Sequence, residues 1–178
     1  MVAMGIFGLL SAVSTLGLFI FITYRMIFWK RFYDSPIATN QIFILIYNLL
    51  LADFQQALSF VISWHWIGEN RLAGPSTVCF AQGWLIHIGD ISSGLFVLSI
   101  GVHTFINLVI RRQVPMKLFI AGVVGLWIFC LILTAIGPII RGRDYFVPAG
   151  AWVSTSLLTP VIILLTETEV LDRPNLRA

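Results

Sequence analysis

The sequence predicts an all-α membrane protein, built as a bundle of transmembrane helices, because of its composition and the length of its uncharged segments. Of the 178 residues, 58% are hydrophobic and 11% are charged, whereas about 25% of the residues of a soluble domain are charged. A helix needs about 20 apolar residues to cross a bilayer. We therefore expect a transmembrane helical domain over residues 1–166 and a short tail over residues 167–178.

Four uninterrupted spans and a fifth, interrupted one account for the apolar segments. The expected spans are 2–24, 37–63, 78–110, 118–140 and, interrupted by proline, 149–166. Asp53 is the only charged residue of the second span, Asp90 is the only one of the third, and the fifth contains Pro160. The connections are short, so neighbouring helices are expected to be antiparallel and adjacent.

The distribution of basic residues predicts the orientation of the chain. The first and third connections contain six basic residues, namely Arg25, Lys30, Arg31, Arg111, Arg112 and Lys117. The second and fourth contain three, namely Arg71, Arg141 and Arg143. Because lysine and arginine collect in cytoplasmic loops, we expect a multi-pass plasma-membrane protein with its N-terminus outside. The net charge of +3 follows from this bias and requires no nucleic-acid partner.

Polar residues inside the second span form a candidate core network of Asn48, Asp53 and Gln56. An ionisable group at the centre of a bilayer costs at least about 2.5 kcal/mol, so it is expected to face a bundle interior or a water-filled cavity. Asp53 and Gln56 share a helical face, whereas Asn48 points toward another neighbour. Two roles remain open for Asp53: a member of a structural polar network, or part of a switch or ion site.

The third span contains a second polar pair. His87 and Asp90 lie at positions i and i+3, where they can hydrogen-bond or share a proton. Asp90 lies about 16 Å along the helix from Cys79, near the midplane. A ligand role and a proton role are both open for this pair. His103 and Asn107, further along the span, are expected to serve packing.

The sequence contains no motif of a known catalytic site. It has no HExxH pattern, no cluster of cysteine and histidine at metal-ligand spacing, and no glycine-rich phosphate loop. It also lacks a Gly-x-Ser-x-Gly segment. We therefore expect neither enzymatic activity nor a cofactor or metal ion.

Four features of the sequence recur in one order and spacing in a known family. They are "NLLLAD" at 48–53, the tryptophans Trp64 and Trp66 before Cys79, the stretch "CFAQGWLIHIGDISSGLFVLSIGVHTF", and the lone Trp127 followed by Pro138. Together they resemble fungal G-protein-coupled receptors of the glucose-receptor and cAMP-receptor-like type. The resemblance covers roughly residues 37–152. It implies a seven-helix receptor fold that couples an outside signal, a nutrient or another small molecule, to the α subunit of a heterotrimeric G protein.

The resemblance also implies roles for individual residues. Asp53 belongs to a core switch network, Cys79 forms a disulfide with the second outer loop, and Arg111 and Arg112 stand near the G protein. The residues expected to edge a ligand pocket are Gln82, Leu85, Ile86, His87, Gly89 and Asp90. The inner end of the third helix reads "HTFINLVIRR". Receptors of the rhodopsin-like type have Asp-Arg-Tyr there as a lock on activation, so this part of the resemblance does not carry over literally.

The sequence departs from the receptor pattern after Trp152. No cysteine follows to pair with Cys79, and the chain continues as "VSTSLLTPVIILLTETEVLDRPNLRA". We therefore expect a truncated or mis-spliced receptor, in which the segment after Trp152 comes from an intron. Two alternatives remain: a small proton-coupled carrier or channel subunit using Asp53, His87 and Asp90, and a four-span scaffold that does not signal.

Overall fold

The four expected transmembrane helices are present in the structure, a computed structural model that describes residues 2–32, 39–69, 76–141, 145–149 and 152–155. The elements in chain order are α1 (Val2–Ile27), α2 (Trp29–Phe32), α3 (Gln41–Val61), α4 (Ser63–Glu69), α5 (Thr77–Phe105), the π-helix η2 (Ile106–Ile110), α6 (Met116–Arg141), β1 (Phe146–Ala149) and β2 (Trp152–Thr155). Four segments are long and apolar enough to cross a membrane: Gly5–Ile27, Gln41–Gly68, Thr77–Ile110 and Met116–Ile140. The prediction of an all-α transmembrane bundle with four spans is confirmed.

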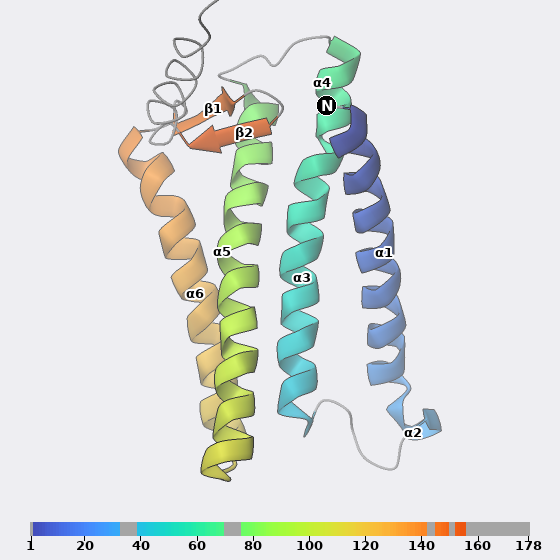
Figure 1. Ribbon diagram of the computed structural model, residues 1–178, viewed down its shortest axis with the longest axis vertical. Helices are drawn as coiled ribbons and strands as arrows, with labels where there is room; N and C mark the ends of the chain where they lie inside the picture. Colours follow the sequence, from blue (N-terminus) through green and yellow to red (C-terminus); the bar gives the residue numbers. More distant parts are fainter. Residues whose placement is uncertain (1, 33–38, 70–75, 142–144, 150–151, 156–178) are drawn as a thin grey trace, which may run out of the picture.

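The long helices stand side by side in the order α1, α3, α5, α6 (Figure 1). Helix α3 packs mainly against α5 and α1, and α5 also packs against α6. The N-terminus, α4 and the strands lie at one end of the bundle, which we call the hairpin end. Helix α2 and the connection between α5 and α6 lie at the other, which we call the α2 end.

Local hydrogen bonds determine where the central helices begin. The side chain of Asn40 accepts a hydrogen bond from the backbone N–H of Ile42 at 3.1 Å, and Ser76 does the same for Cys79 at 3.1 Å. Such caps satisfy backbone donors that the first helical turn leaves free. Helix α5 continues into η2, and this helical segment ends at Arg111, whose φ of 54° is left-handed. This conformation stops the helix and turns the chain toward α6.

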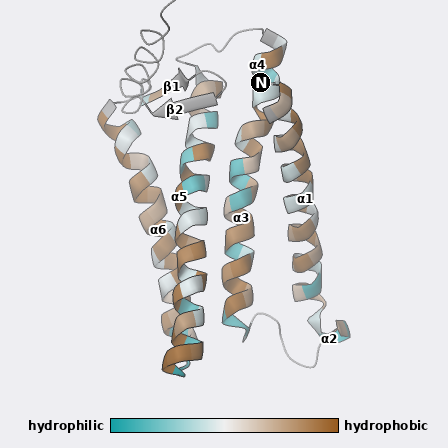
Figure 2. Ribbon diagram, in the orientation of Figure 1, coloured by the Kyte–Doolittle hydropathy of each residue, from teal (hydrophilic) through white to brown (hydrophobic). Residues whose placement is uncertain are grey.

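The outer surfaces of the long helices are apolar. Leu10 on α1, Leu98 on α5 and Ile132 on α6 are 63%, 62% and 54% exposed. Figure 2 shows hydrophobic residues along all four helices, with hydrophilic residues on α3 and α5 in the half nearer the hairpin. Such a large exposed apolar surface is unfavourable in water but not in lipid. The protein is therefore embedded in a membrane.

A glycine, an aromatic pair and a hydrogen bond hold α1 against α3. A Cβ atom at Gly8 of α1 would lie 2.5 Å from the Cβ of Phe60, so α1 and α3 approach closely there. Further along, the rings of Phe19 and Tyr47 stack at 4.7 Å. The hydroxyl of Tyr47 also lies 2.9 Å from Thr23 Oγ1. Helix α1 is thereby held against α3 at both ends of the interface.

A short β-hairpin, absent from the sequence prediction, covers the end of α5. Strands β1 and β2 are antiparallel, with Phe146 opposite Thr155 and Ala149 opposite Trp152. The residues Trp152–Thr155, expected at the start of a fifth span, are therefore a strand. Prolines prevent a continuous helix in this region, and valine and threonine favour strands. The remainder of the expected fifth span and the tail at 167–178 lie outside the described residues.

Candidate functional site

A hydrogen bond between α3 and α6 joins two residues that the sequence analysis singled out separately. The indole Nε1 of Trp127 donates to Oδ1 of Asn48 at 2.8 Å, and the Asn48 amide donates to the carbonyl of Ile44 at 2.8 Å. The Trp127 ring also packs against Phe96 of α5, with 5.4 Å between the ring centroids. These contacts fix the rotation of three helices relative to one another. The expectation that Asn48 points to a neighbouring helix is confirmed.

A second polar contact joins α3 and α5 nearer the hairpin end. The amide Nε2 of Gln56 donates to the carboxylate Oδ1 of Asp90. The helices come close here because Gly89 has no side chain: a Cβ atom at this position would lie 2.8 Å from the Cβ of Gln56. Asp90 is nevertheless exposed at the surface of the four helices. The pair therefore places a carboxylate inside a membrane-spanning segment with one hydrogen-bond partner.

The three members of the expected core network do not form one network. Asn48 bonds to α6 and Gln56 to α5, while the side chain of Asp53 makes no hydrogen bond or ion pair with any other residue in the described part of the chain. Five residues along a helix correspond to a rotation of about 140°, so Asn48 and Asp53 face different neighbours. The side chain of Asp53 is half-buried and has no partner among the residues that the structure describes.

His87 lies against the hairpin and the residue before it. Its ring centroid lies 6.3 Å from those of Tyr145 and Phe146, both in edge contact. The carboxylate of Asp90 bonds to Gln56, and within the described ranges no hydrogen bond joins it to His87. The direct hydrogen bond that the i, i+3 spacing allows is therefore not formed. The tertiary contact with α3 takes its place.

The expected ligand-pocket residues have different environments. Gln82 is fully buried, and its amide accepts from Trp66 Nε1 at 2.6 Å and donates to the carbonyl of Ser59 at 3.1 Å. Gly89 is buried against α3, whereas Leu85 and Ile86 are partly buried. The polar groups of Gln82 are thus bonded to protein partners. The exposed side chain of this set is that of Asp90.

Replacement of Gln82 by methionine is expected to lower the free energy of unfolding by about 1–3 kcal/mol, because the buried indole N–H of Trp66 loses its acceptor. The measurement is thermal unfolding in detergent, followed by circular dichroism. Gln55→Met is the control, since Gln55 is only partly buried and its side chain makes no hydrogen bond to the residues that the structure describes. Equal losses in the two variants would contradict the assigned role.

Both cysteines are free and buried in the structure. The Cys79 thiol at the start of α5 lies 3.7 Å from the carbonyl oxygen of Phe146, in the segment that follows α6. Cys130 lies in the middle of α6. Near the end of the same helix, Pro138 is accommodated inside the helix. Thr134 lies one turn earlier and is fully buried, and its hydroxyl has no hydrogen-bond partner among the described residues.

A polar cluster at the α2 end was not recognised as a unit from the sequence. Gln41 Oε1 lies 2.7 Å from His103 Nε2, and Gln41 Nε2 donates to the carbonyl of Val114 at 2.6 Å. Asn107 Nδ2 lies 3.1 Å from His103 Nδ1. His103 and Asn107, for which packing was expected, take part in these hydrogen bonds. A glutamine at the start of a helix gives no sequence signal of such a role, because its partners are 62 and 73 residues away.

Neither a metal site nor a relative identifies the protein further. In the described ranges no group of three or more His, Cys, Asp and Glu residues could hold a metal ion. Comparisons with protein-family models, with curated proteins and with solved structures found no match. The fold defines the class: a multi-pass helical membrane protein with polar contacts between its second, third and fourth spans.

Proposed function

We propose that the chain is a G-protein-coupled receptor-like membrane protein, of the fungal glucose-receptor and cAMP-receptor-like type, that senses a nutrient or another small molecule. The observation that carries the proposal is the hydrogen bond between Asn48 and Trp127. These two residues come from separate segments of the resemblance and lie 79 residues apart. Their contact supports an arrangement of the second, third and fourth helices like the one that the resemblance implies.

The environment of Cys79 also supports this proposal. The resemblance implies that this cysteine is joined to the second outer loop. The described part of the segment after α6 lies against it, since Cys79, Trp66, Tyr145 and Phe146 form one buried apolar cluster. A receptor of this type has its ligand-binding side at this end of the bundle, outside the cell. The exposed Asp90 and the half-buried His87 are the polar candidates for binding a ligand on this side.

The proposed cytoplasmic side is the α2 end. Six basic residues lie in or next to the elements at this end, namely Arg25, Lys30, Arg31, Arg111, Arg112 and Lys117. Cytoplasmic loops collect such residues. Arg111 and Arg112 are exposed, so both are accessible to the α subunit of a heterotrimeric G protein. This orientation puts the N-terminus outside and fits a plasma-membrane receptor.

A second candidate function is a proton-coupled carrier or channel subunit. The observation that favours it is the pair of carboxylates within the membrane-spanning helices: Asp53 has no partner in the described part of the chain, and Asp90 is exposed. Ionisable groups at this depth are typical of proton paths. A scaffold without a ligand would need neither.

The substitution Asp53→Asn is expected to distinguish these functions. If the chain is a receptor, the substitution changes the rate of nucleotide exchange on a purified G-protein α subunit by at least about fivefold, because the outer and cytoplasmic sides of a receptor are coupled. Proton flux then stays at the background of empty liposomes. The measurements are nucleotide exchange in nanodiscs and proton flux in liposomes containing a pH-sensitive dye.

The control variant is Ser14→Ala, because among the described residues the hydroxyl of Ser14 bonds only to the carbonyl of Leu10 within its own helix, at 2.8 Å. It is expected to leave both measurements unchanged. A proton flux that Asp53→Asn abolishes would contradict the receptor and establish the carrier. If neither the chain nor its variants affect either measurement, the scaffold is correct and both other proposals fail.

A further inference from the structure

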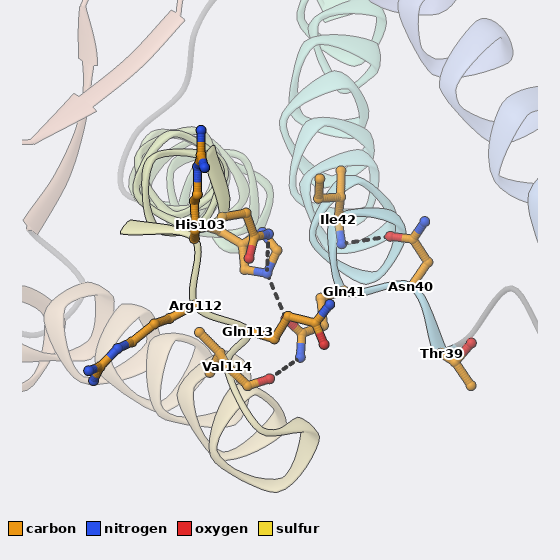
Figure 3. A pocket seen from close by; sticks show the side chains of 10 residues that line it. Thr39, Asn40, Gln41, Ile42, His103, Arg112, Gln113 and Val114 are labelled. Atoms are coloured by element: carbon orange, nitrogen blue, oxygen red, sulfur yellow. Dashed lines mark hydrogen bonds between the residues drawn. The ribbon is translucent and has the colours of Figure 1, made fainter. Parts of the chain in front are cut away.

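A polar cavity of about 440 Å³ opens at the α2 end (Figure 3). It lies between the start of α3, the end of α5 and the connection to α6, and its lining includes Gln41, His103, Asn107, Arg111 and Arg112. The hydrogen bonds of Gln41 to His103 and Val114 join the three elements. The cavity therefore has a wall that is held in place before any ligand binds.

Among the residues that the structure describes, the charge that lines this cavity is positive and unopposed. None of the residues that line it is acidic. Arg111 and Arg112 are exposed, and neither forms an ion pair with another residue in the part of the chain that the structure describes. Figure 3 shows that the side chain of Arg112 extends away from Gln41 and His103, so its charge lies at the rim. The ligand that complements this charge is an anion, which would bind at the rim of the cavity.

An apolar groove of about 410 Å³ adjoins the polar cavity. The two share His103 and Val114, and the groove continues between α5 and α6 along Val102, Leu118 and Gly122. A Cβ atom added at Gly122 would meet nothing within 4 Å. Gly122 lies six residues into α6, which is about 9 Å along the helix from its first turn. The groove therefore runs from the polar end into the apolar part of the bundle.

We propose that the cavity and the groove together bind one anionic phospholipid, with the phosphate at the two arginines and an acyl chain along the groove. An amphiphile is the one ligand that fits both parts, because a free anion leaves the groove empty and a neutral apolar molecule leaves the arginines without a counter-ion. Basic pockets between transmembrane helices bind lipid headgroups in this way. The site does not depend on whether the protein is a receptor or a carrier.

The test is native mass spectrometry of the purified protein, with phosphatidylserine and phosphatidylcholine of identical acyl chains added in equal amounts. The protein is expected to retain phosphatidylserine preferentially. The double variant Arg111→Gln/Arg112→Gln is expected to lose this retention by about tenfold. The matched control, Lys30→Gln/Arg31→Gln, removes the same charge from the same end of the bundle but lies outside both cavities.

A second pair of variants tests the groove. Gly122→Leu is expected to lower phosphatidylserine retention by about threefold, because the new side chain occupies the space of the acyl chain. Gly125→Leu, on the same helix, is the control, since Gly125 also has open space around it but lines neither cavity. Circular dichroism of each variant checks that the helices are still formed.

Three results would overturn the proposal. The first is equal retention of the two lipids by the wild-type protein. The second is an equal loss in the Lys30/Arg31 control, which would indicate general attraction to an anionic surface. The third is displacement of the lipid by millimolar glycerol phosphate together with unchanged binding in Gly122→Leu, which would indicate a site for a free phosphate only.

Discussion

Replacement of Trp127 by alanine is expected to lower the free energy of unfolding by about 3 kcal/mol or more, the usual cost of removing a large packed aromatic side chain. The indole is in contact with Phe96 on α5, at 5.4 Å between the ring centroids, and donates a hydrogen bond to Asn48 on α3. A single substitution therefore removes contacts to two neighbouring helices. The measurement is thermal or denaturant-induced unfolding of the protein in detergent micelles.

The substitution Trp127→Phe separates the hydrogen bond from the packing. It keeps an aromatic ring beside Phe96 but removes the N–H donor, and interhelical hydrogen bonds in membranes contribute about 0.6 kcal/mol on average. We expect a loss of about 1 kcal/mol, and a similar coupling energy in a double-mutant cycle with Asn48→Ala. Strictly additive single losses would show that the bond between Trp127 and Asn48 does not contribute.

Replacement of Gly89 by leucine is expected to separate α3 from α5 and to lower the free energy of unfolding by about 3 kcal/mol, the upper part of the range for overpacked interfaces. Even the first added atom, the Cβ, would lie 2.8 Å from the Cβ of Gln56 and 3.0 Å from its Cα. Because the Cα belongs to the backbone, side-chain rotation alone cannot relieve this overlap. The hydrogen bond between Gln56 and Asp90 should be lost together with the helix contact.

The control for Gly89→Leu is Gly94→Leu, on the same helix. A Cβ at Gly94 would have nothing within 4 Å, and the residue is exposed on the outer surface of the helices. In a bilayer or a micelle the new leucine meets apolar chains, so we expect a change of less than about 0.5 kcal/mol. If the two variants are equally destabilised, the close approach of α3 and α5 at Gly89 is wrong.

The positions of the spans could be predicted from the sequence because crossing a bilayer is a requirement on length and apolarity alone. The second expected span, 37–63, corresponds to α3 and the start of α4, and the fourth, 118–140, lies within α6. Most of the capping chemistry is also local, as at Ser76 before α5. The hairpin was missed because a segment with Phe146 and Trp152 is as apolar as a short helix, and only its pairing reveals the strands.

The partners of the polar residues required the tertiary structure. Asp90 has His87 within one turn of its own helix, but its hydrogen bond goes to Gln56, 34 residues away. Gln82 could equally have faced a ligand, and instead it bonds with Trp66. Such choices depend on how each helix is rotated about its own axis.

The sequence by itself therefore determined that this is a membrane protein of four helical spans, and it located the ionisable residues within them. The tertiary structure decided which of those residues have partners. The physical reason is that apolar length is a property of one segment, whereas the rotation of a helix is determined by packing against its neighbours. Gly89 shows this most directly, since the absence of one side chain brings Gln56 and Asp90 within hydrogen-bonding distance.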